Sequence, residues 1–144
     1  MVTVERLTES SEEAIRDINL LLPQLRQDVH EHKGSLADLQ RIVEDKDVAL
    51  VVAYDEGHIV GMATLYMITK FGKRTGFVED VVVDASQRGK GLGKKILQHL
   101  IDFARAERVK TLHLTSRPDR IEGNKLYQKL GFEIKETNPY RLKL

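Results

Sequence analysis

The 144-residue sequence contains no cysteine, which excludes disulfide bonds, thiolate metal sites and a cysteine nucleophile. No apolar run approaches the roughly 18 residues that a transmembrane helix needs, so we expect no membrane partner. The first six residues lack the basic and apolar regions of a secretory signal peptide. Together, these absences predict a cytoplasmic protein.

Aromatic residues are also scarce, with four Phe and four Tyr. Nucleic-acid-binding surfaces often combine a run of Lys and Arg with aromatic residues among them. This sequence contains no such run. We therefore expect no nucleic-acid partner. The net charge of +1 conceals an asymmetry, since residues 1–85 hold nine Lys/Arg against sixteen Asp/Glu, a net of −7, and residues 86–144 hold fourteen against six, a net of +8. Such a division predicts separate binding surfaces of opposite sign.

What is present is an ordinary globular composition, with 41% hydrophobic and 31% charged residues. The length predicts one domain over residues 1–144. The spacing of apolar residues predicts an α/β fold in the order β-α-α-β-β-β-α-β-α-β-β. The expected strands are Val2–Leu7, Val48–Tyr54, Ile59–Met67, Thr75–Val83, Val109–Leu114, Phe132–Lys135 and Tyr140–Leu144. The expected helices follow Ser10 or Ser11 and Ser35, and cover Ile96–Ala104 and Ile121–Leu130.

The most informative stretch is Arg88–Lys94, where a Gly-rich turn follows a strand and opens a helix. Glycines let a ligand approach the backbone closely, and the free N–H groups of a helix start bind anions. With Arg88, Lys90 and Lys94 adding positive charge, the turn predicts a pyrophosphate site. It has neither the Gly-x-x-x-x-Gly-Lys-[Ser/Thr] pattern of a Walker loop nor the third glycine of a dinucleotide fingerprint.

The spacing Arg-x-x-Gly-x-Gly from Arg88 to Gly93 resembles the acyl-CoA-binding motif of the GNAT superfamily of N-acetyltransferases. A second stretch, Asn124–Phe132, resembles the Tyr-x-x-x-Gly-Phe element that closes the CoA site of that superfamily. The resemblance is best over residues 48–144. It implies a central mixed, mostly antiparallel sheet flanked by helices.

The resemblance also implies that acetyl-CoA acetylates a primary amine, which attacks the thioester directly in a ternary complex. It implies no metal, and a homodimer formed through the C-terminal strands. The backbone of β-strand residues would hold pantetheine, and the Gly-rich turn would hold the pyrophosphate. The cofactor-binding residues so implied are Val81, Val82, Val83, Arg88, Gly89, Lys90, Gly91, Leu92, Gly93, Lys94, Asn124 and Tyr127.

Two side chains are candidates for catalysis. A free amine is protonated at neutral pH because its pKa is about 10.4, so the reaction needs a base. We assign Glu79, which lies inside an apolar strand where alternation places it opposite to Asp80; Asp80 or a water molecule is the alternative. The resemblance implies that the Tyr127 hydroxyl protonates the leaving thiolate, and the alternative is core packing.

The sequence departs from the family pattern before Tyr127. Arg120 stands where many members carry an Asn that binds pantetheine, and Gly123 stands where Ala is usual. Asn124 is the nearest replacement, and Arg120 is free to reach a CoA phosphate or a substrate carboxylate. His30 and His32 resemble a metal pair, but at this spacing they cannot share a helix face, so we expect a loop.

The sequence leaves two classes of function open, an N-acetyltransferase and a non-catalytic acyl-CoA sensor or scaffold. Both the strand carboxylate and the Tyr are present, which favours the enzyme. The acceptor is a small-molecule or peptide amine: a polyamine, an aminoglycoside, an amino sugar, a lysine or a peptide N-terminus. The net charge of −7 over residues 1–85 favours a cationic amine.

Overall fold

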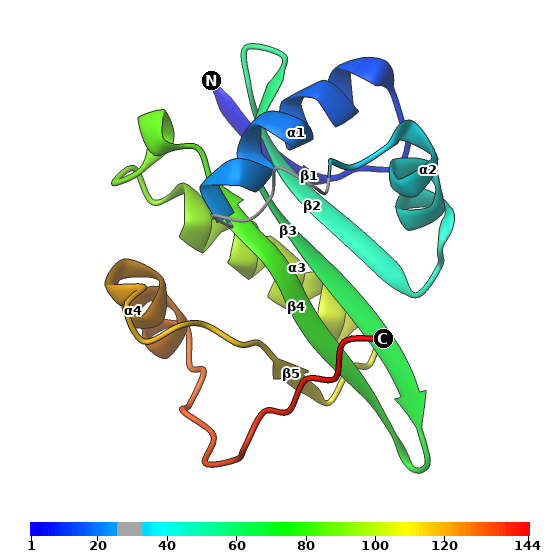
Figure 1. Cartoon of the computed structure of the whole chain (residues 1–144), viewed down its shortest axis with the longest axis vertical. Helices are drawn as coiled ribbons and strands as arrows, with labels where there is room; N and C mark the ends of the chain where they lie inside the picture. Colours follow the sequence, from blue (N-terminus) through cyan, green and yellow to red (C-terminus); the bar gives the residue numbers. More distant parts are fainter. Residues whose placement is uncertain (26–32) are drawn as a thin grey trace.

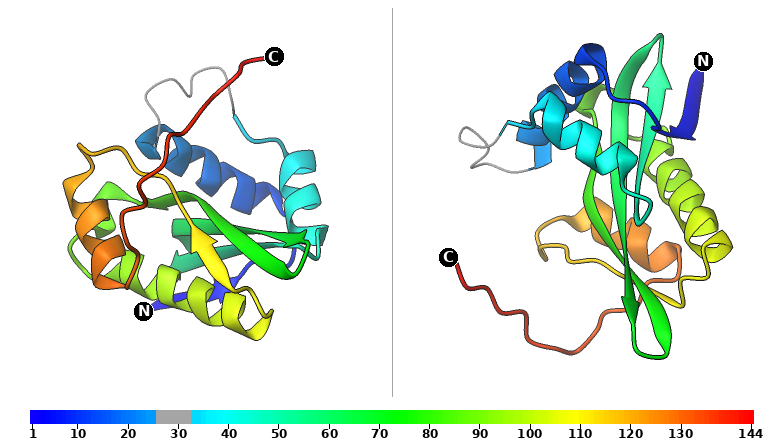
Figure 2. Two further views of the ribbon diagram at one scale, coloured as in Figure 1. Left: turned by 90° about the horizontal axis from the view of Figure 1, so that it is seen from below. Right: turned by 90° about the vertical axis from the view of Figure 1, so that its right-hand side faces the viewer.

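The computed structural model describes residues 1–25 and 33–144, which form a five-stranded sheet with helices on both faces (Figures 1 and 2). Residues 26–32, which include His30 and His32, lie outside the described residues. The order of elements matches the predicted order through the last helix. The elements are β1 (Val2–Arg6), α1 (Glu12–Leu25), α2 (Leu36–Glu44), β2 (Val48–Asp55), β3 (His58–Lys70), β4 (Lys73–Val83), the 3₁₀ turn η2 (Ala85–Gln87), α3 (Leu92–Ala106), β5 (Thr111–His113) and α4 (Ile121–Lys129).

The strands lie in the sheet in the order in which they occur in the chain. β1 to β4 pair antiparallel, and β5 pairs parallel with β4. The predicted mixed, mostly antiparallel sheet is therefore confirmed. Gly57 turns the chain between β2 and β3, and Gly72 does so between β3 and β4, each with a positive φ that glycine adopts without steric cost.

The two faces of the sheet are packed by different helices. On one face Ala49, Val51, Leu65 and Val78 form a buried core with α3. On the other, residues such as Leu50 form a second core with α1 and α2. Figure 2 shows α3 on one side of the sheet and α1 and α2 on the other.

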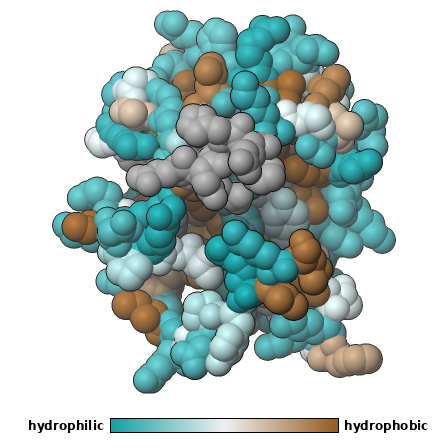
Figure 3. Space-filling view, viewed as in Figure 1, coloured by the Kyte–Doolittle hydropathy of each residue, from teal (hydrophilic) through white to brown (hydrophobic). Residues whose placement is uncertain are grey.

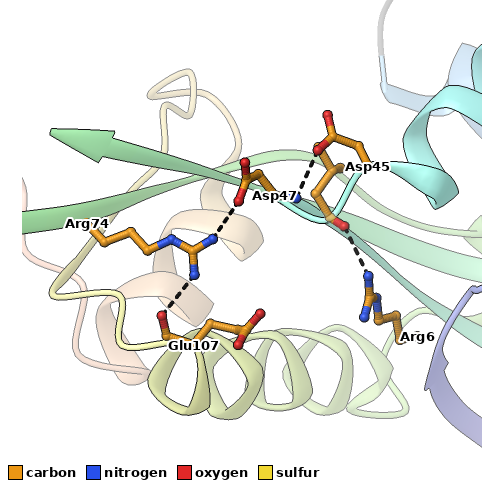
Figure 4. Close-up of polar contacts among 6 residues, drawn as sticks. Arg6, Asp45, Asp47, Arg74 and Glu107 are labelled. Carbon is orange, nitrogen blue, oxygen red and sulfur yellow. Dashed lines mark hydrogen bonds and ion pairs between the residues drawn. The ribbon is translucent and has the colours of Figure 1, made fainter.

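Polar contacts fix the helices to this frame. Ser35 and Asp38 form a capping box at the start of α2, in agreement with the helix that was expected to follow Ser35. The buried carboxylate of Asp17, on α1, accepts the backbone N–H of Ile59 over 2.9 Å. At the far end of α3, the Arg74 guanidinium joins Asp47 to the Glu107 carbonyl, over 2.7 and 2.9 Å (Figure 4).

The chain after α4 differs from the prediction. Residues 132–144, all of which the structure describes, contain no strand, although strands were expected over 132–135 and 140–144. The segment starts at α4, beside α3, and passes to the α1–α2 side of the sheet, where the chain ends (Figures 1 and 2). A strand forms only beside a partner strand. The nearest edge strand, β5, is short, with only three residues paired to β4, so it gives the segment little edge to pair with. Figure 3 shows apolar side chains reaching the surface in the lower half of this face; exposed apolar residues of the segment are Ile134, Tyr140, Leu142 and Leu144.

None of the helices within residues 1–25 and 33–144 is long and apolar enough to cross a membrane.

Candidate active site

The Gly-rich turn presents open backbone at the start of α3. Gly89 and Gly91 have φ angles of 78° and 76°, and a Cβ on either would meet no atom within 4 Å. Gly91 is the N-cap of α3 and makes no side-chain capping bond, so the N–H groups of the first turn are available to an anion. Arg88, Lys90 and Lys94 are exposed around this turn. The geometry suits the pyrophosphate that the sequence predicted there.

Two other residues of the turn have packing roles. Leu92 is buried in the α3-side core, so only its backbone can face a ligand. A Cβ on Gly93 would lie 3.2 Å from Leu126 on α4 and 3.7 Å from Val83 on β4. The absence of a side chain at Gly93 therefore lets α3, α4 and the end of β4 meet, which places α4 beside the turn.

The upper part of β4 leaves its neighbour β5. Their pairing covers only Thr75–Phe77 and Thr111–His113, whereas β4 continues to Val83. Val81, Val82 and Val83 therefore have one backbone edge that β5 does not pair. This edge is the place where the resemblance implied that pantetheine binds.

A bulge interrupts β4 at the candidate base. Glu79 lies opposite Thr64 and Val82 lies opposite Met62, so Asp80 and Val81 share one partner position on β3. Asp80 has a φ of 52°, a left-handed conformation that Asp tolerates better than most residues.

The bulge overturns the expected alternation. Val78 packs in the α3-side core, but Val82 packs in the α1-side core, so side chains four residues apart lie on opposite faces. The strand alternation from which Glu79 and Asp80 were expected to point to opposite faces is therefore interrupted at this point. Burial, followed by the negative charges of Asp80 and Glu79, raises the pKa of Tyr66 on β3. Both carboxylates thus act on the same phenol.

Tyr127 lies on α4 with its ring along the helix, 3.6 Å from the position of a Cβ on Gly123. Its ring meets that of Phe132 edge to face at 6.1 Å between centroids, and it packs against the α3-side core. Burial raises the pKa of the Tyr127 hydroxyl, and the positive charge of Arg120 partly opposes that effect. The phenol is therefore protonated at neutral pH and able to donate a proton.

The loop between β5 and α4 contains the departures from the family pattern. The Asn124 side-chain nitrogen donates to the carbonyls of Arg117 and Arg120, over 2.9 and 2.8 Å, which leaves its side-chain oxygen to accept a bond from a ligand. Arg120 donates to the carbonyl of Leu25 at the end of α1, rather than pointing freely toward a phosphate. Ser116 carries a buried hydroxyl with no hydrogen-bond partner among the described residues, a group that a bound amide would satisfy.

Sequence reasoning missed the residue that joins α1 to the Gly-rich turn. Gln24 bonds the side chain of Asp84 and the backbone of Ala85, sixty residues further along the chain. Nothing local to Gln24 signals this contact. It also missed Tyr66, Phe77 and His113, which three adjacent strands bring together and which occur singly in the sequence.

Comparison with known proteins agrees with this geometry. The acetyltransferase (GNAT) family model matches residues 13–132. The glucosamine 6-phosphate N-acetyltransferase of Trypanosoma brucei brucei is 40% identical over 83 residues, which cover 56% of this chain and 54% of that protein. The chain therefore spans about half the length of this curated relative. The spermine/spermidine N(1)-acetyltransferase of Bacillus subtilis (strain 168) is 28% identical over 138 residues, covering 92% and 88% of the two chains.

A solved structure extends the match to the whole fold. The crystal structure of a Trypanosoma brucei acetyltransferase superposes with a TM-score of 0.80 and 30% sequence identity, covering 100% of both chains. The arrangement of β4, the Gly-rich turn, α3 and α4 thus belongs to a fold that acetyltransferases use.

Proposed function

This chain belongs to the acetyltransferase (GNAT) family, and we propose that it transfers an acetyl group from acetyl-CoA to the nitrogen of a primary amine. The observation that carries the proposal is the meeting of three elements at one place. The open turn of Gly89 and Gly91, the edge of β4 that β5 does not pair and the helix that carries Tyr127 converge where Gly93 packs against Leu126.

Acetyl-CoA fits the residues present. Its pyrophosphate carries negative charge, which the N–H groups of the α3 start and the exposed Arg88, Lys90 and Lys94 would neutralise. Its pantetheine amides would pair with the backbone of Val81–Val83. The buried hydroxyl of Ser116 and the side-chain oxygen of Asn124 are further polar groups on the loop nearby.

In the proposed reaction the amine attacks the thioester carbonyl directly. A carboxylate takes the proton that the amine must lose, either in contact with it or through water. We assign this role to Glu79, an exposed residue of β4 beside the bulge. Its neighbour Asp80 and a water molecule are the alternatives, which the variants below separate.

The transfer is complete when the nitrogen–carbon bond has formed and the carbon–sulfur bond has broken. The electron pair of that bond leaves with sulfur, and the thiolate is a better leaving group when it gains a proton. We assign the donor role to the Tyr127 hydroxyl, because burial raises its pKa and so keeps it protonated. The amine loses two protons in all. Glu79 takes the one that leaves before the attack, and the second, which leaves the nitrogen after the nitrogen–carbon bond has formed, restores the Tyr127 hydroxyl that has given its proton to sulfur.

We further propose that the protein forms a homodimer through residues 140–144. Tyr140, Leu142 and Leu144 alternate with polar residues and are exposed, and β5 is an edge strand. An exposed edge and an unpartnered apolar segment favour pairing between chains. Light scattering at micromolar concentration tests this proposal, which predicts twice the mass of one chain; the mass of one chain would contradict it.

The experiment that tests the enzymatic function measures free CoA thiol when the purified protein meets acetyl-CoA and a panel of amines. The proposal predicts amine-dependent thiol release, and loss of that release in Gly91→Asp, because a carboxylate would then stand at the pyrophosphate site. If acetyl-CoA binds and no amine accelerates thiol release, the chain is an acyl-CoA sensor or scaffold instead.

A further inference from the structure

Three rings lie in a row across the sheet on the face that carries α1 and α2. Tyr66 on β3 lies opposite Phe77 on β4, and Phe77 lies opposite His113 on β5. The Phe77 and His113 rings stack with centroids 5.3 Å apart and planes inclined by 28°. Since neighbouring strands are about 4.8 Å apart, the row spans about 10 Å. Glu79 follows on the same face, two residues after Phe77.

The β3 end of this row lies among negative charges. Tyr66 is half-buried, and burial and then the charges of Asp80, Glu79 and Asp45 raise its pKa. An ammonium group placed beside Tyr66 and Phe77 would therefore be attracted to this end. The proposed base, Glu79, stands on the adjacent strand β4, opposite Thr64 of β3.

The β5 end of the row lies among positive charges. Burial, and then the charges of Lys135, Lys70 and Lys73, lower the pKa of His113. The Lys70 ammonium lies 5.8 Å from the centroid of the Phe77 ring, over its face. Lys135 belongs to the segment after α4, which passes from α4 to the α1–α2 side of the sheet (Figure 2). The β3–β4 hairpin and the segment after α4, which are distant in sequence, thus bring cations to one place.

We infer that the acceptor is a primary amine that also carries an anionic group, and that Lys70, Lys135 and His113 bind this group while the amine stands at Glu79. The inference rests on the proposed acetyl transfer and adds the substrate class. Phe77, between the two ends, would support the carbon skeleton. A phosphate and a carboxylate are the two anions that suit such donors.

This inference revises the cationic acceptor expected from the charge of residues 1–85. That net charge of −7 includes Lys70 and Lys73, which the β3–β4 hairpin carries to the basic end of the row. The sum over a segment does not tell where its charges lie. A cationic polyamine would find a matching charge at one end of the row and a repelling charge at the other.

The test compares acceptors that differ only in the anionic group. Glucosamine 6-phosphate is paired with glucosamine, and 2,4-diaminobutyrate is paired with 1,3-diaminopropane, which lacks only its carboxylate. We expect kcat/KM to be at least about tenfold higher for the anionic member of one pair, the gain that a charge-assisted contact supplies. A larger ratio in the sugar pair identifies phosphate as the anion, and a larger ratio in the other pair identifies carboxylate.

Variants then locate the effect. Lys70→Gln and Lys135→Gln should each raise KM for the anionic member several-fold and leave kcat, and the KM of its partner compound, unchanged. Arg105→Gln, which removes a positive charge from an exposed position of α3 on the other face, should change neither KM. Added salt should reduce the wild-type preference and have less effect on the two lysine variants.

The outcomes separate this inference from the proposed function. If glucosamine and 1,3-diaminopropane are acetylated as well as their anionic partners or better, the inference is wrong and the acetyltransferase stands. An equal loss of preference in Arg105→Gln would also overturn it, because the preference would then be a property of the total charge. If no amine is acetylated although acetyl-CoA binds, the proposed function fails and the inference fails with it.

Discussion

The side chain of Gln24, at the end of α1, holds Asp84 at the end of β4. Its Nε2 donates to Asp84 Oδ1 over 2.8 Å, and its Oε1 accepts the N–H of Ala85 over 2.9 Å. The hydrogen bond from Gln24 is the largest of the contacts that lower the pKa of Asp84. Asp84 in turn accepts the N–H of Ser86 over 3.1 Å. Gln24 therefore ties α1 to the segment that leads into the Gly-rich turn.

Gln24→Ala should raise KM for acetyl-CoA about twofold to fivefold, because the turn loses one anchor worth roughly 0.5–1 kcal/mol at an exposed position. Steady-state kinetics with varied acetyl-CoA measures this change. The matched control is Gln98→Ala, which removes a similar amide–carboxylate bond to Asp102 on the exposed side of α3. An equal rise of KM in both variants would show that Gln24 has no specific role.

The same pair predicts a pH dependence. Because the pKa of Asp84 is lowered in the folded protein, its contacts stabilise the fold above the ordinary pKa of Asp and cease to do so as pH falls through the lowered pKa. The difference in unfolding free energy between wild type and Gln24→Ala should thus be present at pH 7 and shrink below about pH 4. Urea denaturation at both pH values measures it. A difference that grows in acid would contradict this assignment.

Gly91 and Gly57 form a matched pair of positions that tests the phosphate site, with Gly57 as the control. Their φ angles are 76° and 82°, and a Cβ on either meets no atom within 4 Å. Ala at either position should therefore cost a similar backbone strain of about 1 kcal/mol. Only Gly91→Ala should weaken acetyl-CoA binding, by about tenfold, since the N–H groups beside it lose their orientation. Calorimetric titration measures both affinities, and equal affinities would place the pyrophosphate elsewhere.

Tyr127→Phe should lower kcat and leave the acetyl-CoA affinity unchanged. The substitution removes only the hydroxyl, so the edge-to-face contact with Phe132 persists and the fold should lose at most about 1 kcal/mol. Tyr54→Phe is the control, because burial also raises the pKa of Tyr54, on β2. Full activity of Tyr127→Phe would show that Tyr127 only packs in the core and donates no proton.

The sequence alone predicted the parts of the site that are local in the chain. The Gly-rich turn from Arg88 to Lys94 follows a strand and opens a helix, as its composition required. The helix that carries Tyr127 was also predicted, and it ends where Gly131, with φ 102°, allows the chain to turn. In each case the signal is a run of adjacent residues with a fixed conformational preference.

The parts that escaped prediction depend on tertiary context. The bulge at Asp80 arises from pairing between β3 and β4, and alternation along one strand cannot reveal it. The segment over 132–144 has strand-like alternation, but a strand also needs a partner edge. The row formed by Tyr66, Phe77 and His113 exists only once three strands are in register.

The assignment of the base predicts a pH–rate profile. Glu79→Gln should lower kcat/KM about 10²- to 10⁴-fold at neutral pH, and the loss should shrink as the pH approaches about 10, where the amine deprotonates unaided. Asp80→Asn is the control, since Asn tolerates the left-handed backbone found at Asp80 as well as Asp does. A larger loss in Asp80→Asn would move the base to Asp80, and an unchanged profile in both would assign the role to water.

The central claim is that this site moves an acetyl group from CoA to nitrogen, and the most direct measurement is the product balance of one reaction. Purified protein, acetyl-CoA and an accepted amine are incubated together, free thiol is titrated, and the acetylated amine is quantified by mass spectrometry. The account predicts one N-acetylated amine for every thiol released, with both products lost together in Gly91→Asp. Thiol release without an N-acetylated product would contradict it, because the acetyl group would then have gone to water.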